Sequence, residues 1–147
     1  MLLPFFEGII AAIGSLILEL APTLFGFNFT EGSLLFLFFG ATVEETVKFI
    51  FIYNRYLKLS AKEQILPGTI LLGLGFALTE LFLKQLPVEK NLFLPVAGIF
   101  LVHISTTLLL GILLRKNRQK NRLFSFFIVL FNIFIHFSYN LFVLRYL

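Results

Sequence analysis

Long apolar stretches dominate the chain, and each is close to the length that a membrane crossing requires. A bilayer-spanning helix needs about 20 mostly apolar residues. The pattern therefore predicts an all-α fold, a polytopic transmembrane helical bundle of about five helices. The five apolar blocks are Leu2–Phe25, Leu34–Tyr53, Ile65–Leu86, Leu92–Leu114 and Leu123–Leu144.

The links between the blocks are short and polar, and they leave no room for an extramembrane domain. We find no low-complexity stretch or soluble linker, so residues 1–147 are expected to form a single transmembrane helical domain. The first block follows no basic segment and precedes no clear small-residue cleavage signature. We therefore expect it to be retained as a span rather than removed as a signal peptide.

Composition supports a bilayer environment. The chain is 59% hydrophobic and 14% charged, with a mean hydropathy of +0.96, whereas soluble domains average roughly 45–50% apolar and about 25% charged residues. The absence of cysteine excludes disulfides and thiolate metal sites. The net charge of +4 comes mainly from lysines and arginines in the links, so the lipid bilayer is an expected partner and nucleic acid is not.

The basic residues are distributed unevenly between the links, and lysine and arginine favour the cytoplasmic side of a membrane. If the five helices alternate in direction, eight basic residues fall on one side and three on the other. This predicts a multi-pass protein of the cell membrane, with a cytoplasmic N-terminus and an extracytoplasmic C-terminus. The eight are Arg55, Lys58, Lys62, Arg115, Lys116, Arg118, Lys120 and Arg122, and the three are Lys84, Lys90 and Arg145.

The second block contains an adjacent pair of acidic residues, Glu44 and Glu45, followed by Lys48. Charged groups inside a bilayer are costly, so they normally face the interior of a bundle and mark a functional site. Lys48 lies one turn after the pair and can reach either carboxylate. A carboxylate in such a setting can accept and return a proton, as general acid–base catalysis requires.

The last three blocks each carry further polar residues. Glu80 follows Phe76 by one turn, His103 lies in the fourth block, and His136 precedes Asn140 by one turn in the fifth. Counted at about 1.5 Å of rise per residue, the glutamates and histidines of four helices fall within a slab about 8 Å thick. We therefore expect these side chains to face one another. Glu7 and Glu19 of the first block belong to no recognisable motif and are left outside this group.

The order of these motifs resembles that of a known family. Glu44-Glu45-x-x-Lys48, Phe76-x-x-x-Glu80, His103 and His136-x-x-x-Asn140, on successive helices, are similar to the PrsW family of intramembrane proteases. They are more distantly similar to the type II CAAX prenyl endopeptidases and their bacterial relatives. The similarity extends from Glu44 to Asn140. The chain departs from the PrsW pattern in having Ala41 in place of a frequent proline and Leu81 in place of a frequent asparagine.

The resemblance implies an intramembrane endopeptidase that acts on a membrane-anchored protein or peptide, for PrsW an anti-sigma-type regulator. Glu44, with or without Glu45, would then be the general base, and His103 and His136 would orient the water or bind a metal. Asn140 would stabilise the oxyanion through its amide, and Lys48 would be the charge partner of the glutamates. Glu80 would be a ligand or an orienting residue.

Two questions stay open at the level of the sequence. Two histidines with a carboxylate, drawn from Glu44, Glu80, His103 and His136, form an adequate set for zinc or another divalent metal, but a metal-free site is equally consistent with these residues. The same buried Glu/His cluster could also serve a non-enzymatic, proton-coupled membrane carrier or relay. Against a carrier, the chain shows no repeated half or pair of broken helices.

Overall fold

All the elements in the described part of the chain are helices. The computed structural model describes residues 2–27, 30, 32–58, 65–83, 93–116 and 121–146. This confirms the predicted all-α bundle of about five helices. The helices are α1 (Leu3–Leu24), α2 (Leu34–Lys58), α3 (Ile65–Leu83), α4 (Phe93–Lys116) and α5 (Arg122–Tyr146).

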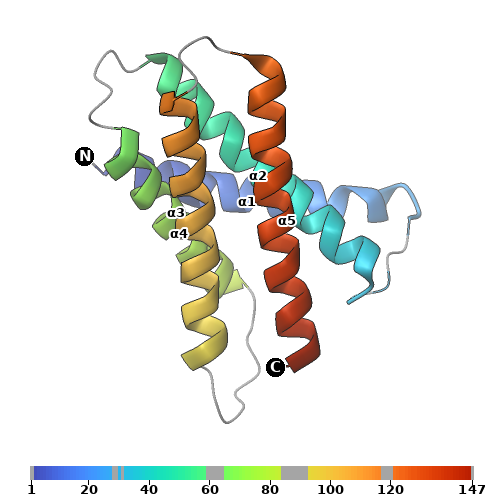
Figure 1. Cartoon of the computed structure of the whole chain (residues 1–147). Coiled ribbons are helices and arrows are strands. Elements are labelled where there is room, and N and C mark those ends of the chain that lie inside the picture. The colour runs from blue at the N-terminus through green and yellow to red at the C-terminus, as the bar shows by residue number, and fades with distance from the viewer. Residues whose placement is uncertain are drawn as a thin grey trace.

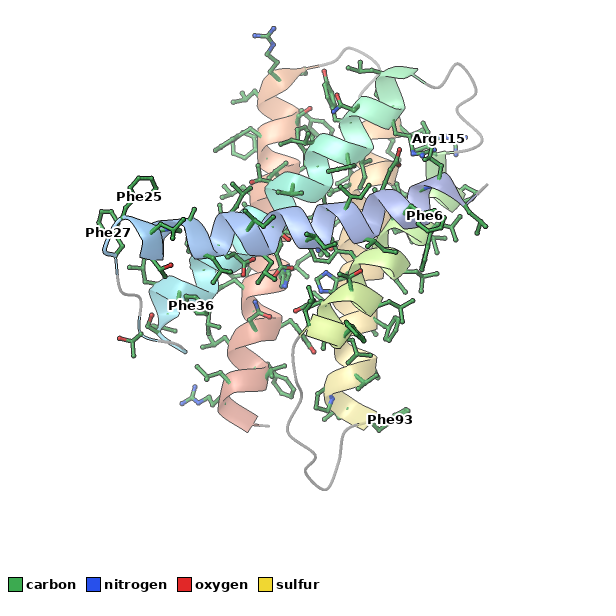
Figure 2. All side chains as sticks on the ribbon, turned by 180° about the vertical axis from the view of Figure 1, so that it is seen from behind. Phe6, Phe25, Phe27, Phe36, Phe93 and Arg115 are labelled. Atoms are coloured by element: carbon green, nitrogen blue, oxygen red, sulfur yellow. The ribbon has the colours of Figure 1, made fainter. Side chains whose placement is uncertain are left out.

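Four of the five helices, α1, α3, α4 and α5, are long and apolar enough to cross a membrane. In α2 the apolar run is interrupted by Glu44, Glu45 and Lys48. The packing is inside-out relative to a soluble protein, because large apolar side chains such as Leu101 point outward while charged ones are enclosed. Figure 2 labels further exposed apolar side chains, among them Phe6, Phe25 and Phe93. The chain is therefore built as a multi-pass helical membrane protein.

The helices do not all run in one direction. Helices α4 and α5 lie side by side, α2 passes obliquely behind α5, and α1 runs across the bundle (Figure 1). Figure 2 shows the crossing from behind: α1 extends from Phe6 to Phe25 across α4, whose two ends are marked by Phe93 and Arg115. The apolar first block thus forms a helix, but one that lies crosswise to α4 and α5.

The helix ends that adjoin the two basic links lie together. The C-terminal ends of α2 and α4 and the N-terminal end of α5 are at the top of Figure 1. This arrangement agrees with the expectation that both links share a side. Which side is cytoplasmic stays a prediction, since several of the residues on which it depends lie outside the described part of the chain. These are Lys62, Lys84, Lys90, Arg118 and Lys120.

Glycines allow α3 to approach its two main neighbours closely. A Cβ added at Gly75 would overlap the carbonyl oxygen of Phe5 in α1, and one added at Gly8 would overlap that of Leu72 in α3. On the α4 side, a Cβ on Gly73 would lie 2.9 Å from the His103 carbonyl oxygen. Small residues at such contacts are typical of membrane helix packing, which depends on close van der Waals contact.

The sequence identified only part of this packing. Gly73 and Ala77 lie one turn apart, a spacing of small residues that is typical of contacts between membrane helices, and the structure places α4 against Gly73. Gly75, by contrast, points toward α1, and no pattern within the third block indicates that a crosswise helix lies there. Helix α3 is therefore held by backbone contact on two sides, and it positions Phe76 and Glu80 between α1 and α4.

We predict that Gly75→Ala lowers the stability of the protein while Gly14→Ala does not. The added methyl group at Gly75 would overlap α1 backbone, whereas at Gly14 nothing lies within 4 Å of it. Overpacking of this kind typically costs about 1–3 kcal/mol, and replacing glycine at an open helical position is neutral or favourable. Thermal unfolding of the two purified variants in detergent measures the difference. Equal melting temperatures would show that α1 does not pack on Gly75.

Candidate active site

The predicted polar residues of four helices meet in the centre of the bundle. Helix α2 supplies Glu44, Glu45 and Lys48, and one residue comes from each of α3, α4 and α5. Glu45, Lys48, His103 and His136 are fully buried, and Glu44 and Glu80 are 6% and 8% exposed. The structure thus brings together six of the seven residues that the sequence singled out, at one place.

The helical repeat assigns the two adjacent glutamates to different surroundings. Residues spaced by three or four along a helix share a face, and Ala41, Glu45, Lys48 and Ile52 form the fully enclosed face of α2. Glu44 is turned by about 100° from Glu45. It borders a small cavity between α1, α2 and α3. The two carboxylates therefore have different partners.

Glu45 joins three helices through one oxygen atom. Its Oε1 accepts hydrogen bonds from Lys48 Nζ at 2.7 Å, from His136 Nδ1 at 2.8 Å and from Thr106 Oγ1 at 3.2 Å. These donors belong to α2, α5 and α4. A buried carboxylate with several donors is stabilised in its charged form, so Glu45 is an ionised anchor for the surrounding side chains.

Lys48 connects Glu45 to His103. Its Nζ lies 2.7 Å from His103 Nδ1 and 4.4 Å from the centre of the Phe76 ring. Because an ammonium group can only donate hydrogen bonds, His103 Nδ1 must be the acceptor, and the ring proton is then on Nε2. That nitrogen faces Glu80 Oε2, to which it donates. His103 is thereby held as a neutral ring between a cation and a carboxylate.

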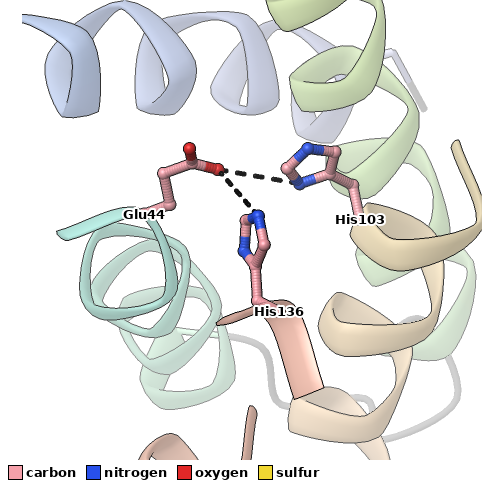
Figure 3. A group of neighbouring side chains, drawn as sticks. All are labelled: Glu44, His103 and His136. Carbon is pink, nitrogen blue, oxygen red and sulfur yellow. Dashed lines mark ion pairs between the residues drawn. The ribbon is translucent and has the colours of Figure 1, made fainter. Parts of the chain in front are cut away.

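His136 has the opposite tautomer. Its Nδ1 donates to Glu45, so in a neutral ring Nε2 carries a lone pair. This Nε2 is buried and has no hydrogen-bond partner among the described residues. It faces Glu44 Oε2 at a distance of 3.7 Å, and the same oxygen lies 4.0 Å from His103 Nδ1 (Figure 3). A carboxylate behind one imidazole nitrogen is the arrangement that orients histidine ligands and bases.

These three side chains fit a divalent metal in part. The ligand atoms of Glu44, His103 and His136 all lie within 4.8 Å of one another, and a tetrahedral zinc site with bonds of about 2.0–2.1 Å separates its ligands by about 3.4 Å. Glu44 and His136 are already close to this ligand separation and would have to approach each other only slightly. The lone pair of His103 Nδ1, however, is already used by Lys48, so a third protein ligand requires that Lys48 withdraw. Glu80 lies on the far side of the His103 ring, at Nε2.

The charges of the cluster do not balance. Glu44, Glu45 and Glu80 count as three negative charges when ionised, and Lys48 supplies one positive charge, so the sum is −2 with both rings neutral. Net charge in a medium of low polarity is costly. Full ionisation of the cluster is therefore unfavourable, and binding of protons or of a cation would stabilise it.

A small cavity gives access to the cluster. Its volume is about 50 Å³, and Glu44, Glu80 and Phe76 line it together with Ser15 and Glu19 of α1. This volume is enough for water, since one water molecule needs roughly 10–15 Å³. Glu19 was left outside the predicted site because it has no motif, yet the crossing of α1 brings it to this cavity. Glu7, likewise unassigned, pairs with Arg55 of α2 at 2.7 Å.

Two buried polar residues of the site were missed. Thr106 binds Glu45, as described, and Asn132 Nδ2 donates to the Thr106 carbonyl oxygen at 3.4 Å while its Oδ1 has no partner in the described part of the chain. Asn132 lies one turn before His136 and is fully buried. Asn140, one turn after His136, is only half-buried. Spacing from His136 alone could have identified Asn132, because positions four residues on either side share its face.

Comparison with known proteins adds no assignment to this site. No family model, curated protein or solved structure matches the chain. The likeness to PrsW proteases therefore depends on the motif order alone, and the function of the buried cluster has to be argued from its geometry.

Proposed function

We propose that the chain is an intramembrane endopeptidase, in which Glu44 and His136 activate a water molecule to hydrolyse a peptide bond of a membrane-associated protein. The observation that carries the proposal is His136 Nε2, a buried ring nitrogen with no hydrogen-bond partner among the described residues. Glu45 orients its ring, and the nitrogen faces Glu44 Oε2 at 3.7 Å. A water molecule placed beside this edge can lie about 2.8 Å from both atoms.

The proposed reaction assigns different roles to the paired glutamates. Glu45 Oε1 already accepts three hydrogen bonds, so Glu45 positions His136 and is not the base. Glu44 accepts a proton from the water, whose oxygen attacks the carbonyl carbon. When the carbon–nitrogen bond breaks, Glu44 returns that proton to the leaving amine, as a general acid–base pair does. Asn140 stays the predicted oxyanion donor.

A metal would find its ligands in the same place. Glu44 and His136 would hold it, with His103 as third ligand once Lys48 has withdrawn, and the ion would supply Lewis-acid activation of water and carbonyl. A sum of −2 in the fully ionised cluster would favour such an ion. His103 is otherwise a positioning residue, held by Lys48 and Glu80.

The surroundings of the site favour a substrate that is itself in the membrane. The cavity beside Glu44 lies between apolar helices, and Leu16, Phe76 and Leu83 form much of its wall. A helical substrate segment has to unwind into an extended peptide before its peptide bonds can be attacked. An anti-sigma-type regulator, the substrate class associated with PrsW, has a single span of this kind and is the proposed substrate.

We expect Glu44→Gln and His136→Ala to abolish cleavage of a single-span reporter protein in proteoliposomes. Losing the base or its partner typically costs a factor of about 10²–10⁴ in rate. Ser138→Ala is the matched control on α5, because Ser138 is exposed and, among the described residues, its side chain bonds only to the Phe134 carbonyl oxygen. Cleavage that survives both site substitutions would refute the protease proposal. Unfolding temperatures of the variants separate loss of chemistry from loss of fold.

If a metal rather than Glu44 activates the water, the purified protein should bind about one zinc ion per chain and His136→Ala should lose it, because a three-ligand site does not retain the metal without one of its two imidazoles. Elemental analysis after dialysis measures the content. The Ser138→Ala variant should keep the full amount. Cleavage by wild-type protein that holds no metal, in the presence of a chelator, would contradict a role for zinc. Lys48 would then be the resident cation of the cluster.

A second function is favoured by one specific observation. Glu80, His103, Lys48, Glu45 and His136 form a continuous chain of hydrogen bonds across the bundle. Such chains carry protons in membrane pumps and transporters, so a proton relay is the alternative. Proton flux into proteoliposomes, followed with an internal pH dye, distinguishes the two. Flux that depends on Lys48 and occurs without any cleavage would favour the relay.

A further inference from the structure

A second and larger cavity lies on the other side of α2, away from Glu44. It has a volume of about 600 Å³ and is bounded by α2 and α5. Its α2 wall consists of Phe38, Thr42, Thr46, Phe49 and Tyr53, a stripe next to the face that carries Glu45 and Lys48. None of the residues proposed for hydrolysis lines it, so it is separate from the candidate active site.

The cavity is an apolar groove with a charge at one end. Phe126 and Ile133 of α5 line it, and Arg122, the first residue of α5, closes it at the end that adjoins the basic links. Arg122 is exposed and forms no ion pair with any residue that the structure describes. Arg115 and Lys116, in the last turn of α4, are also exposed. This end of the groove is therefore suited to an anion.

The length of the groove corresponds to one leaflet. Ile133 lies 11 residues after Arg122 on the α5 wall of the groove. This separation amounts to about 16 Å along the helix at a rise of about 1.5 Å per residue. One half of a bilayer hydrocarbon core is about 15 Å thick. A molecule with its anionic group at Arg122 and its apolar part along the groove therefore ends near the bilayer centre.

We propose that this groove binds an anionic phospholipid, with the phosphate at Arg122 and one acyl chain between α2 and α5. Basic pockets between transmembrane helices typically bind such headgroups. A second transmembrane helix is a poorer fit, because an apolar helix offers no anionic group to Arg122 at the end of the groove. The site is independent of the proposed protease activity.

The proposal is tested by native mass spectrometry of the full chain, delipidated in detergent and titrated with phosphatidylglycerol or phosphatidylcholine of the same acyl chains. We expect tighter binding of phosphatidylglycerol, and about fivefold weaker binding by Arg122→Gln, the share of one basic side chain near an anionic surface. Lys116→Gln, which removes a charge at the same end but outside the groove, should bind within twofold of wild type. Thr46→Phe, which fills the groove, should weaken both lipids.

Each alternative outcome would overturn the proposal. Equal binding of the two lipids would exclude headgroup recognition. An equal loss in Arg122→Gln and Lys116→Gln would indicate general surface charge rather than a site. Unchanged binding by Thr46→Phe would place the lipid elsewhere. Displacement of bound lipid by a single-span peptide that binds more tightly would identify a polypeptide as the occupant of the groove.

Discussion

The central constraint on this molecule is the burial of a single carboxylate oxygen, Glu45 Oε1, which receives donors from three helices. In a hydrocarbon environment an unsatisfied ionised group is costly, so α2, α4 and α5 must keep their relative register for the chain to be stable. The neighbouring positions follow from this register. His136 can present its second nitrogen to Glu44 only because its first nitrogen is held by Glu45, and Lys48 can reach His103 only from the same turn of α2.

The glycine contacts of α3 complete this arrangement from the other side. Glu80 reaches His103 because α3 approaches α4 as closely as Gly73 allows, and Phe76 is held beneath Lys48 and the His103 ring by the same contact. The close packing of α3 on α4 therefore keeps Glu80 within reach of His103. Without the glycine contact, α3 and α4 would separate by the width of a side chain, and the Glu80 carboxylate would lose its partner. The polar cluster and the glycine contacts form one structural unit.

Much of this could be predicted from the sequence, because the strongest signals were local. Runs of about 20 apolar residues specify membrane helices, and polar residues at similar depth on successive helices have to meet. What could not be predicted depends on how the helices cross. The path of α1 brings Glu19 to the cavity and Phe5 to Gly75, and no periodicity within the first block encodes that path. The division of roles between Glu44 and Glu45 required the positions of Thr106 and His136, which belong to other helices.

Lys48 has a consequence for how the protein is made. Its ammonium group stands between Glu45 and His103, so the nascent chain carries its own counter-ion into the membrane. A carboxylate and a lysine one turn apart on the same helix can pair before any other helix has packed against them. This lowers the cost of placing the Glu45 carboxylate in the membrane while the bundle assembles. The pair thus serves the insertion of α2 as well as the folded cluster.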